Sequence, residues 1–372
     1  MNNRIHGGFA QGEDSNVLAS NVLDFSINVN PIGPPAAVKD AMNEAIRHID
    51  RYPDPSCHKL CCALANYHGI ESSQLICANG AGDLIFQVIG VLKPKTALCL
   101  APDFSEYEQA LRVQGTAIQY YELKRDNGFA LDEAYLSMLK KIHPDLIVLV
   151  NPHNPTGNLI DESLLERIIS FAQAANITVL LDECFIEFTD RESLIRRISE
   201  FSNLFLIRAF TKSFALPGLR LGYGACADEK LIQQIIACRQ PWSVSLIAQE
   251  AGLAALKELA YQKETKKVIQ DEQDYLKETK KMIRIERDYL IHELKKLEFC
   301  VFPSETNFIL FQTNQDIYTQ LMSRGICIRD CSNYRTLEQG FYRVAVKQHH
   351  ENRQLIETLK LIINRTESLP LT

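Results

Sequence analysis

Residues 146–157, LIVLVNPHNPTG, place a short apolar run directly before a turn with two Asn-Pro steps and a glycine. The apolar run has the length of a buried strand. The Asn-Pro steps and Gly157 specify a rigid turn at the carboxyl end of that strand. Ligands bind at this end of the strands in open α/β sheets, so the turn is either part of a ligand site or a purely structural feature.

Outward from this stretch, short apolar runs alternate with amphipathic helical patterns. Strands are predicted at residues 96–101, 146–150, 178–181 and 204–208, and helices at 104–114 and 161–175. This alternation indicates an α/β fold in which helices cover both faces of a mostly parallel sheet.

The character of the chain changes near residue 257. Residues 257–297 are rich in charge and lack Gly and Pro, which predicts long, partly exposed helices. Short strands mixed with helices follow, at 308–312, 325–329 and 341–346, and indicate a smaller α+β domain. We therefore expect an N-terminal arm with part of the small domain at 1–45, a large domain at 46–260, and a linking helix with the small domain at 261–372.

Composition excludes several classes of function. The 372 residues carry 40 basic and 46 acidic side chains, and the net charge of −6 argues against nucleic acid as a main partner. The apolar runs are too short to span a membrane. Residues 1–16 lack the apolar core of a secretory segment, so the 11 cysteines are expected as reduced thiols in a cytoplasmic protein. Cys57 and Cys61 would share a helix face, as metal ligands or as small buried side chains.

Two more strand ends carry polar or small residues. Asn79-Gly-Ala-Gly-Asp83 follows the strand LICA, and its small residues let backbone amides approach a phosphate, although a simple strand–helix turn fits equally well. Ile85 stands where a dinucleotide fingerprint needs glycine. Asp182 follows the strand ITVLL, where a carboxylate is either a site residue or a helix cap.

Residues 211–223, TKSFALPGLRLGY, follow the strand LFLIR. Lys212 lies among apolar and hydroxyl residues, where a lysine can be desolvated and made nucleophilic. Arg220 follows in a glycine-bounded turn, from which its guanidinium can return to the same pocket and bind a phosphate through two hydrogen bonds.

Together, NPHNPTG, the DE-x-F element at 182–185 and TKxxxLPGLRLGY resemble the fold-type I pyridoxal-phosphate enzymes of the aspartate-aminotransferase superfamily. The resemblance covers nearly the whole chain and implies pyridoxal 5'-phosphate as cofactor. It implies that Lys212 holds the cofactor as a Schiff base and later moves protons. Asp182 would pair with the pyridine nitrogen, and Asn154 would bind the phenolic oxygen of the ring.

The same resemblance implies the remaining cofactor contacts. Phe104 would stack on the ring, with Tyr107 as a competitor for that place. Tyr52 would reach the cofactor phosphate from the neighbouring subunit, so a homodimer is expected. The other expected cofactor-binding residues are Arg220 and the amides of Gly80, Ala81 and Gly82 at the phosphate, and Thr211 beside the lysine.

Two positions depart from the family pattern. Phe185 stands where the family usually has tyrosine, which removes one hydrogen bond to the phenolic oxygen. Ala209 stands where serine or threonine is frequent, which removes one phosphate contact. Neither change removes an essential group.

Within the superfamily, the elements RYPDP and NPHNPTG are shared with histidinol-phosphate aminotransferases. The chain is also similar at both ends to the threonine-phosphate decarboxylases of cobalamin biosynthesis. That second likeness lies in His6-Gly-Gly8, in DFSINVNPIGPP at 24–35, in IRDCSNY at 328–334 and in GFYRVAVK at 340–347.

The likeness implies a phosphorylated amino acid, threonine phosphate or serine phosphate, as substrate. Arg329 and Arg343 would hold its phosphate and its carboxylate. His6 and Asn28 would also bind it, unless His6 is a plain tail residue and Arg329 only pairs with Asp330. The bond to Cα that stands perpendicular to the cofactor ring is the one that breaks, so substrate orientation selects decarboxylation or transamination. An aminotransferase and a non-catalytic ligand sensor are the alternatives.

Overall fold

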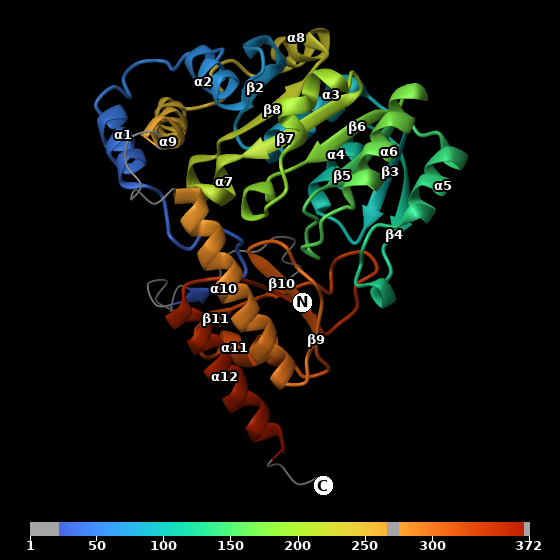
Figure 1. Cartoon of the computed structure of the whole chain (residues 1–372), viewed down its shortest axis with the longest axis vertical. Helices are drawn as coiled ribbons and strands as arrows, with labels where there is room; N and C mark the ends of the chain where they lie inside the picture. Colours follow the sequence, from blue (N-terminus) through green and yellow to red (C-terminus); the bar gives the residue numbers. More distant parts are fainter. Residues whose placement is uncertain (1–21, 266–274, 368–372) are drawn as a thin grey trace.

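The computed structural model describes residues 22–265 and 275–367. It is built around a seven-stranded sheet, whose arrangement can be followed in Figure 1. All neighbouring strands are parallel except β8, which is antiparallel to both β2 and β7. The predicted α/β fold with a mostly parallel sheet is confirmed. The strand order is β2 (Leu75–Ala78), β8 (Gly222–Cys226), β7 (Leu204–Ala209), β6 (Thr178–Asp182), β5 (Leu146–Val150), β3 (Thr96–Ala101), β4 (Ala117–Glu122).

Helices cover both faces of this sheet, which explains why its central strands are apolar throughout. On β3, Leu98 and Leu100 pack into one buried cluster, and Ala97 and Cys99 into another on the opposite face. The first cluster includes α2 (His58–His68), α5 (Glu133–Ile142), α6 (Glu162–Ala174) and α9 (Leu246–Thr265). The second includes α3 (Ala81–Leu92), α4 (Ser105–Val113) and α8 (Glu229–Cys238). Short helical turns join them: η1 (Ser72–Gln74), η2 (Arg125–Asn127), η3 (Ile186–Phe188), η4 (Leu194–Glu200), α7 (Phe210–Ser213) and η5 (Pro217–Leu219).

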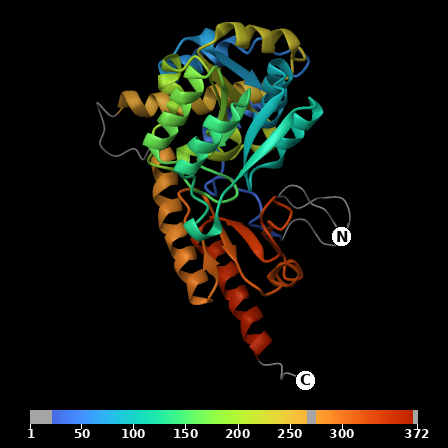
Figure 2. The same cartoon turned by 90° about the vertical axis from the view of Figure 1, so that its right-hand side faces the viewer.

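A smaller antiparallel sheet carries the C-terminal part of the chain. Its order is β12 (Arg329–Asp330), β13 (Phe341–Ala345), β10 (Phe308–Gln312), β9 (Cys300–Val301), and α11 (Ile317–Met322) and α12 (His349–Glu367) pack beside it. The long helix α10 (Tyr275–Lys296), orange in both views, leads from the large sheet to the small one (Figures 1 and 2).

The N-terminal residues join both parts. β1 (Leu23–Asp24) pairs in parallel with β11 (Ile326–Cys327), beside the small sheet, whereas α1 (Ala36–Ile46) packs on α9. The predicted strand at 325–329 is in fact two strands, β11 and β12, which belong to different sheets and break at Ile328. The predicted boundary at residue 260 falls within α9, and the domain division stays a prediction. No helix within 22–265 or 275–367 is long and apolar enough to cross a bilayer.

The cysteine cluster lies in the apolar core. Cys57 and Cys61 are buried, and the Cys61 Sγ lies 3.7 Å from the Cys77 Sγ on β2. Cys57 and Cys61 belong to the same buried apolar cluster as the leucines of α2, so they fit the interpretation as small buried side chains. All eleven cysteines are free thiols.

Candidate active site

A cavity of about 280 Å³ lies where the carboxyl ends of the parallel strands face the small sheet. Residues far apart in the sequence meet there because parallel strands bring their carboxyl ends to one edge. Most of the predicted site residues line it: Asn28, Ala81, Gly82, Phe104, Asn154, Asp182, Thr211, Lys212, Arg220, Arg329 and Arg343.

The turn before α3 and Arg220 form an anion-binding cradle at one end of the cavity. Gly80 has φ +91°, and a Cβ there would lie 2.7 Å from the Arg220 Nη2. A Cβ on Gly222 would lie 2.5 Å from the Ala81 backbone nitrogen. Gly80 thus lets the Arg220 guanidinium lie against the turn, and Gly222 lets the start of β8 lie against the first amide of α3, an arrangement suited to a phosphate.

Lys212 lies on α7, directly after β7, in apolar surroundings. Its Nζ is 5.4 Å from the centroid of the Phe185 ring. Burial, and then the positive charge of Arg343, lower the pKa of Lys212 from 10.5 to about 8. A neutral, nucleophilic amine is therefore far more populated at physiological pH than for an exposed lysine.

This pKa makes a testable prediction for the cofactor-free protein. Covalent attachment of an aldehyde needs the neutral amine, so the rate of uptake of pyridoxal 5'-phosphate, the cofactor that the sequence resemblance implies, rises with pH and reaches half of its maximum near pH 8, not near 10.5. Absorbance of the bound cofactor after mixing measures that rate. Arg343→Gln removes a positive charge and moves the midpoint to higher pH. A midpoint that stays near 10 in the native protein contradicts the assignment.

Asp182 is held by two donors at the end of β6. The Tyr107 hydroxyl donates to its Oδ2, and the Cys184 backbone N–H donates to its Oδ1 at 2.7 Å. Tyr107 is buried and lies edge-on to Phe104, with ring centroids 6.0 Å apart. Both rings line the cavity, so which of them stacks on the cofactor stays a prediction, while the hydroxyl of Tyr107 makes a contact that fixes the carboxylate. Phe104 is the N-cap of α4 and Tyr107 lies three residues later, so their spacing was the sequence signal that the two rings lie near each other.

Tyr107→Phe removes this hydrogen bond and keeps the ring. We expect the carboxylate to lose its orientation, and the affinity for pyridoxal 5'-phosphate to fall roughly fivefold to tenfold, the effect of one buried hydrogen bond to a charged group. Equilibrium titration with the cofactor checks this. Tyr135→Phe is a matched control, since its buried hydroxyl has no partner among the described residues. Equal affinity in the native protein and Tyr107→Phe would contradict the positioning role.

Two arginines from the small sheet reach the other end of the cavity. Arg329 on β12 and Arg343 on β13 lie directly opposite each other, and each is 5% exposed. Arg343 donates to the Asn154 Oδ1 and, at 3.0 Å, to the Ser26 carbonyl. Arg329 donates to the Asp330 carbonyl at 2.6 Å and to the Asn333 Oδ1 at 2.8 Å. Two buried cations on one face suit a substrate with two anionic groups.

The segment after β1 closes the wall between the arginines and Lys212. The Asn28 Oδ1 is buried and has no hydrogen-bond partner among the described residues. The Asn30 backbone N–H donates to the Lys212 carbonyl at 3.0 Å, and its side chain donates to the Ser213 carbonyl at 2.9 Å and the Tyr275 hydroxyl at 2.9 Å. Asn30 and Tyr275 therefore anchor the lysine helix, a role that sequence reasoning missed.

Of the remaining predicted residues, Tyr52 and His6 are not part of the described cavity, whereas the two positions that depart from the family pattern are. Tyr52 is 81% exposed and lies beside Trp242, with ring centroids 4.7 Å apart and the rings tilted by 31°, outside the cavity of its own chain. His6 lies outside the described residues. Phe185 and Ala209 both line the cavity, so the two departures from the family pattern face the cofactor region.

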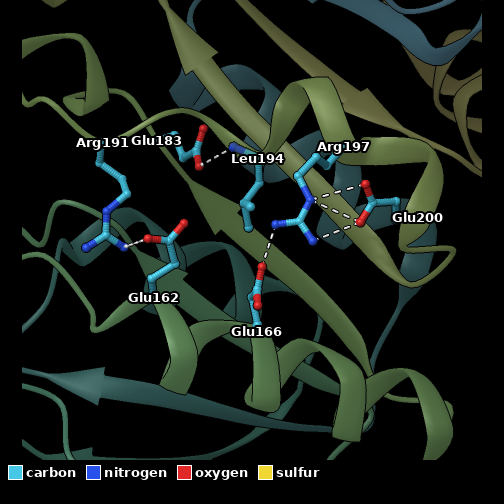
Figure 3. A network of polar contacts seen from close by, with 7 residues as sticks. All are labelled: Glu162, Glu166, Glu183, Arg191, Leu194, Arg197 and Glu200. Carbon is cyan, nitrogen blue, oxygen red and sulfur yellow. Dashed lines mark hydrogen bonds and ion pairs between the residues drawn. The ribbon is translucent and has the colours of Figure 1, made fainter.

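Glu183, the neighbour of Asp182, is structural. Its carboxylate accepts the Leu194 backbone N–H at 3.1 Å, and burial raises its pKa. Arg197 then joins Glu200 to Glu166 on α6, as Figure 3 shows. These contacts hold η4 against Glu183 at the end of β6 and against Glu166 on α6.

Comparisons with known proteins agree with this arrangement. A family model described as aminotransferase class I and II matches residues 20–359. The threonine-phosphate decarboxylase of Salmonella typhimurium is 33% identical over 370 residues, 97% of each chain. The adenosylcobalamin biosynthesis bifunctional protein CobDQ of Leptospira interrogans is 34% identical over 98% of this chain and 42% of that protein. The histidinol-phosphate aminotransferase of Clostridium acetobutylicum has a similar crystal structure, with a TM-score of 0.82 and 30% identity over 92% of this chain and 100% of that chain.

Proposed function

The chain belongs to the aminotransferase class I and II family, and we propose that it is a pyridoxal-phosphate-dependent carboxy-lyase that decarboxylates L-threonine O-3-phosphate. The pair of opposed, buried arginines carries this proposal, because it offers one cation to a carboxylate and another to a phosphate. The likeness to the Salmonella enzyme over 97% of both chains supports the same reaction. The amino-alcohol phosphate formed serves cobalamin biosynthesis, in line with the likeness to the Leptospira protein.

Pyridoxal 5'-phosphate fits the residues present. The cradle of Gly80, Ala81 and Arg220 suits its phosphate, and the Asp182 carboxylate, held by Tyr107, suits a protonated pyridine nitrogen. The Asn154 Oδ1 accepts a hydrogen bond from Arg343, which leaves the NH2 group of Asn154 as a donor for the phenolic oxygen. Thr211 and Phe104 complete the wall. When bound, the cofactor supplies an electron sink for the bond that breaks at Cα.

Residues of this chain bind the substrate and move the proton. Asp182 keeps the pyridine nitrogen protonated. Arg343 holds the carboxylate of the substrate and Arg329 its phosphate. The buried Oδ1 of Asn28 accepts a hydrogen bond from the substrate. Lys212 binds the cofactor and, with a pKa lowered to about 8 in the cofactor-free chain, would donate to Cα the proton that replaces the departing CO₂. The substrate orientation set by the two arginines selects loss of CO₂ over loss of the Cα proton.

Product analysis tests this assignment. We expect cofactor-loaded protein to convert O-phosphothreonine to 1-aminopropan-2-yl phosphate, seen as a new phosphorus resonance, and to convert O-phosphoserine more slowly. The two substrates differ by one methyl group, worth roughly 1 kcal/mol of burial. A histidinol-phosphate aminotransferase is the second candidate, favoured by the similar Clostridium structure. It requires 2-oxoglutarate and forms glutamate.

The proposal includes a homodimer, because Tyr52 is exposed on its own chain and would act at the neighbour's cofactor phosphate. We also place the enzyme in the cytoplasm.

Mixed dimers test the shared site. Tyr52→Phe and Lys212→Ala chains are mixed after dissociation and allowed to reassociate. One site of each mixed dimer then combines a native Lys212 with a native Tyr52 from the neighbour, so activity recovers toward about a quarter of the native value, while each variant alone stays low. No recovery places Tyr52 outside the neighbour's site.

A further inference from the structure

We propose that Arg335 is a positioning residue that clamps the loop carrying Asn333 and Tyr334 onto the large sheet and thereby sets where Arg329 holds the substrate phosphate. This inference rests on the proposed function. Nothing in the assigned site includes Arg335, which follows β12 in the loop at 331–340.

A second cavity, of about 80 Å³, adjoins the one that holds the cofactor residues. Both are lined by Arg329 on β12, by Tyr334 in the loop that follows, by Phe104 at the N-cap of α4 and by Tyr107 on α4. Arg335 lines only the second cavity, together with Glu108 and Tyr120. Arg329 therefore contributes to the walls of both cavities, whereas Arg335, whose side chain is 44% exposed, contributes only to the second.

Arg335 contacts two elements of the large sheet's layer. Its guanidinium carbon lies 4.0 Å from the centroid of the Tyr120 ring on β4, a close cation–π contact. Its Nη2 lies 3.5 Å from the Glu108 Oε1 on α4. Glu108 also pairs with Arg112 on its own helix, at 2.6 Å. The loop from the small sheet is thus joined to α4 and β4 at the rim of the site.

Both sides of this contact continue directly into the site. On the loop, the Asn333 Oδ1 accepts from Arg329 at 2.8 Å, and the Arg329 guanidinium lies 5.2 Å from the Tyr334 ring. On α4, Tyr107 precedes Glu108 and holds Asp182. Arg335 is therefore adjacent in sequence to Tyr334, which contacts Arg329. Glu108 is adjacent to Tyr107, which holds Asp182.

The consequence concerns the choice of reaction. The distance between the phosphate held by Arg329 and the groups around Lys212 sets how the substrate is rotated about Cα. A clamp that fixes this distance favours the orientation in which the carboxylate leaves. Loosening it weakens binding through the phosphate and lets a larger share of turnovers lose the Cα proton instead, so that a 2-oxo acid is released and the amino group stays on the cofactor.

The test compares Arg335→Gln with Arg112→Gln, a matched control that removes the other cation beside Glu108 without touching the loop. Dissociation constants for O-phosphothreonine and for threonine are measured from the absorbance of the bound cofactor, and the ratio of 2-oxo acid to CO₂ from the products. We expect Arg335→Gln to weaken O-phosphothreonine binding roughly threefold to tenfold, the size of one cation–π contact with a surface ion pair. In Arg335→Gln, threonine binding stays unchanged and the ratio of 2-oxo acid to CO₂ rises. Arg335→Lys restores part of the lost O-phosphothreonine binding. Tyr120→Leu has the same effect as Arg335→Gln.

Equal effects of Arg335→Gln on both ligands, or the same effects from Arg112→Gln, overturn the clamp. The binding ratio does not depend on the reaction catalysed. A native protein that releases no CO₂ refutes the proposed function, while a selective loss of phosphate-dependent binding in Arg335→Gln still supports the clamp.

Discussion

Lys212→Ala abolishes CO₂ release from O-phosphothreonine and the absorbance of the covalently bound cofactor. The amine is the nucleophile that the site offers, with its pKa lowered to about 8 in the apolar wall formed with Phe185. In the proposed mechanism Lys212 also donates the proton to Cα, and loss of a positioned proton donor alone costs roughly 10²- to 10⁴-fold in rate. The rate is measured by trapping CO₂ and the spectrum by absorbance.

Two variants serve as controls for this result. Lys212→Arg keeps the positive charge and lacks the neutral amine, so it should be as inactive as the alanine variant. Lys230→Ala removes an exposed lysine at the start of α8 and should retain full activity. Appreciable turnover by Lys212→Ala would contradict the assignment of the catalytic lysine.

Arg329→Ala reduces kcat/KM for O-phosphothreonine roughly 30-fold to 10³-fold, the loss expected when one partner of a desolvated, hydrogen-bonded charge pair is truncated. The same change leaves binding of unphosphorylated threonine within about twofold, because Arg343 still holds the carboxylate. Steady-state kinetics and binding titrations with both ligands measure the difference.

Arg329→Lys distinguishes charge from geometry. It keeps the cation and loses the planar fork that donates to Asn333 and the Asp330 carbonyl, so an intermediate loss is expected. Arg324→Ala, on an exposed side chain nearby in the sequence, should have no effect. Equal losses for phosphorylated and unphosphorylated ligands would refute the phosphate role.

The strand ends could be predicted from the sequence because their patterns are local. Asn154, Asp182 and Lys212 each follow an apolar run, and parallel strands bring such ends to one edge whatever lies between them. Gly80 and Arg220 were found in the same way, from a glycine turn and a cation after a strand. The cofactor expected from these motifs agrees with the family.

Contacts between distant segments could not be predicted. The Tyr107 hydroxyl meets Asp182 across 75 residues of sequence, and Asn30 reaches the Ser213 carbonyl across 183. The ion pair between Arg335 and Glu108 forms only because the loop between β12 and β13 lies against α4 in the folded chain. The two short strands at 326–327 and 329–330 were merged into one because a two-residue strand leaves almost no periodic pattern.

The most direct test is CO₂ release by cofactor-loaded protein from O-phosphothreonine, without any 2-oxo acid, measured by trapping labelled CO₂ from the carboxyl carbon. We predict sustained release, many CO₂ molecules per active site, with O-phosphoserine slower. Absence of release, together with glutamate formation from histidinol phosphate only when 2-oxoglutarate has been supplied, would contradict the account and make the protein an aminotransferase.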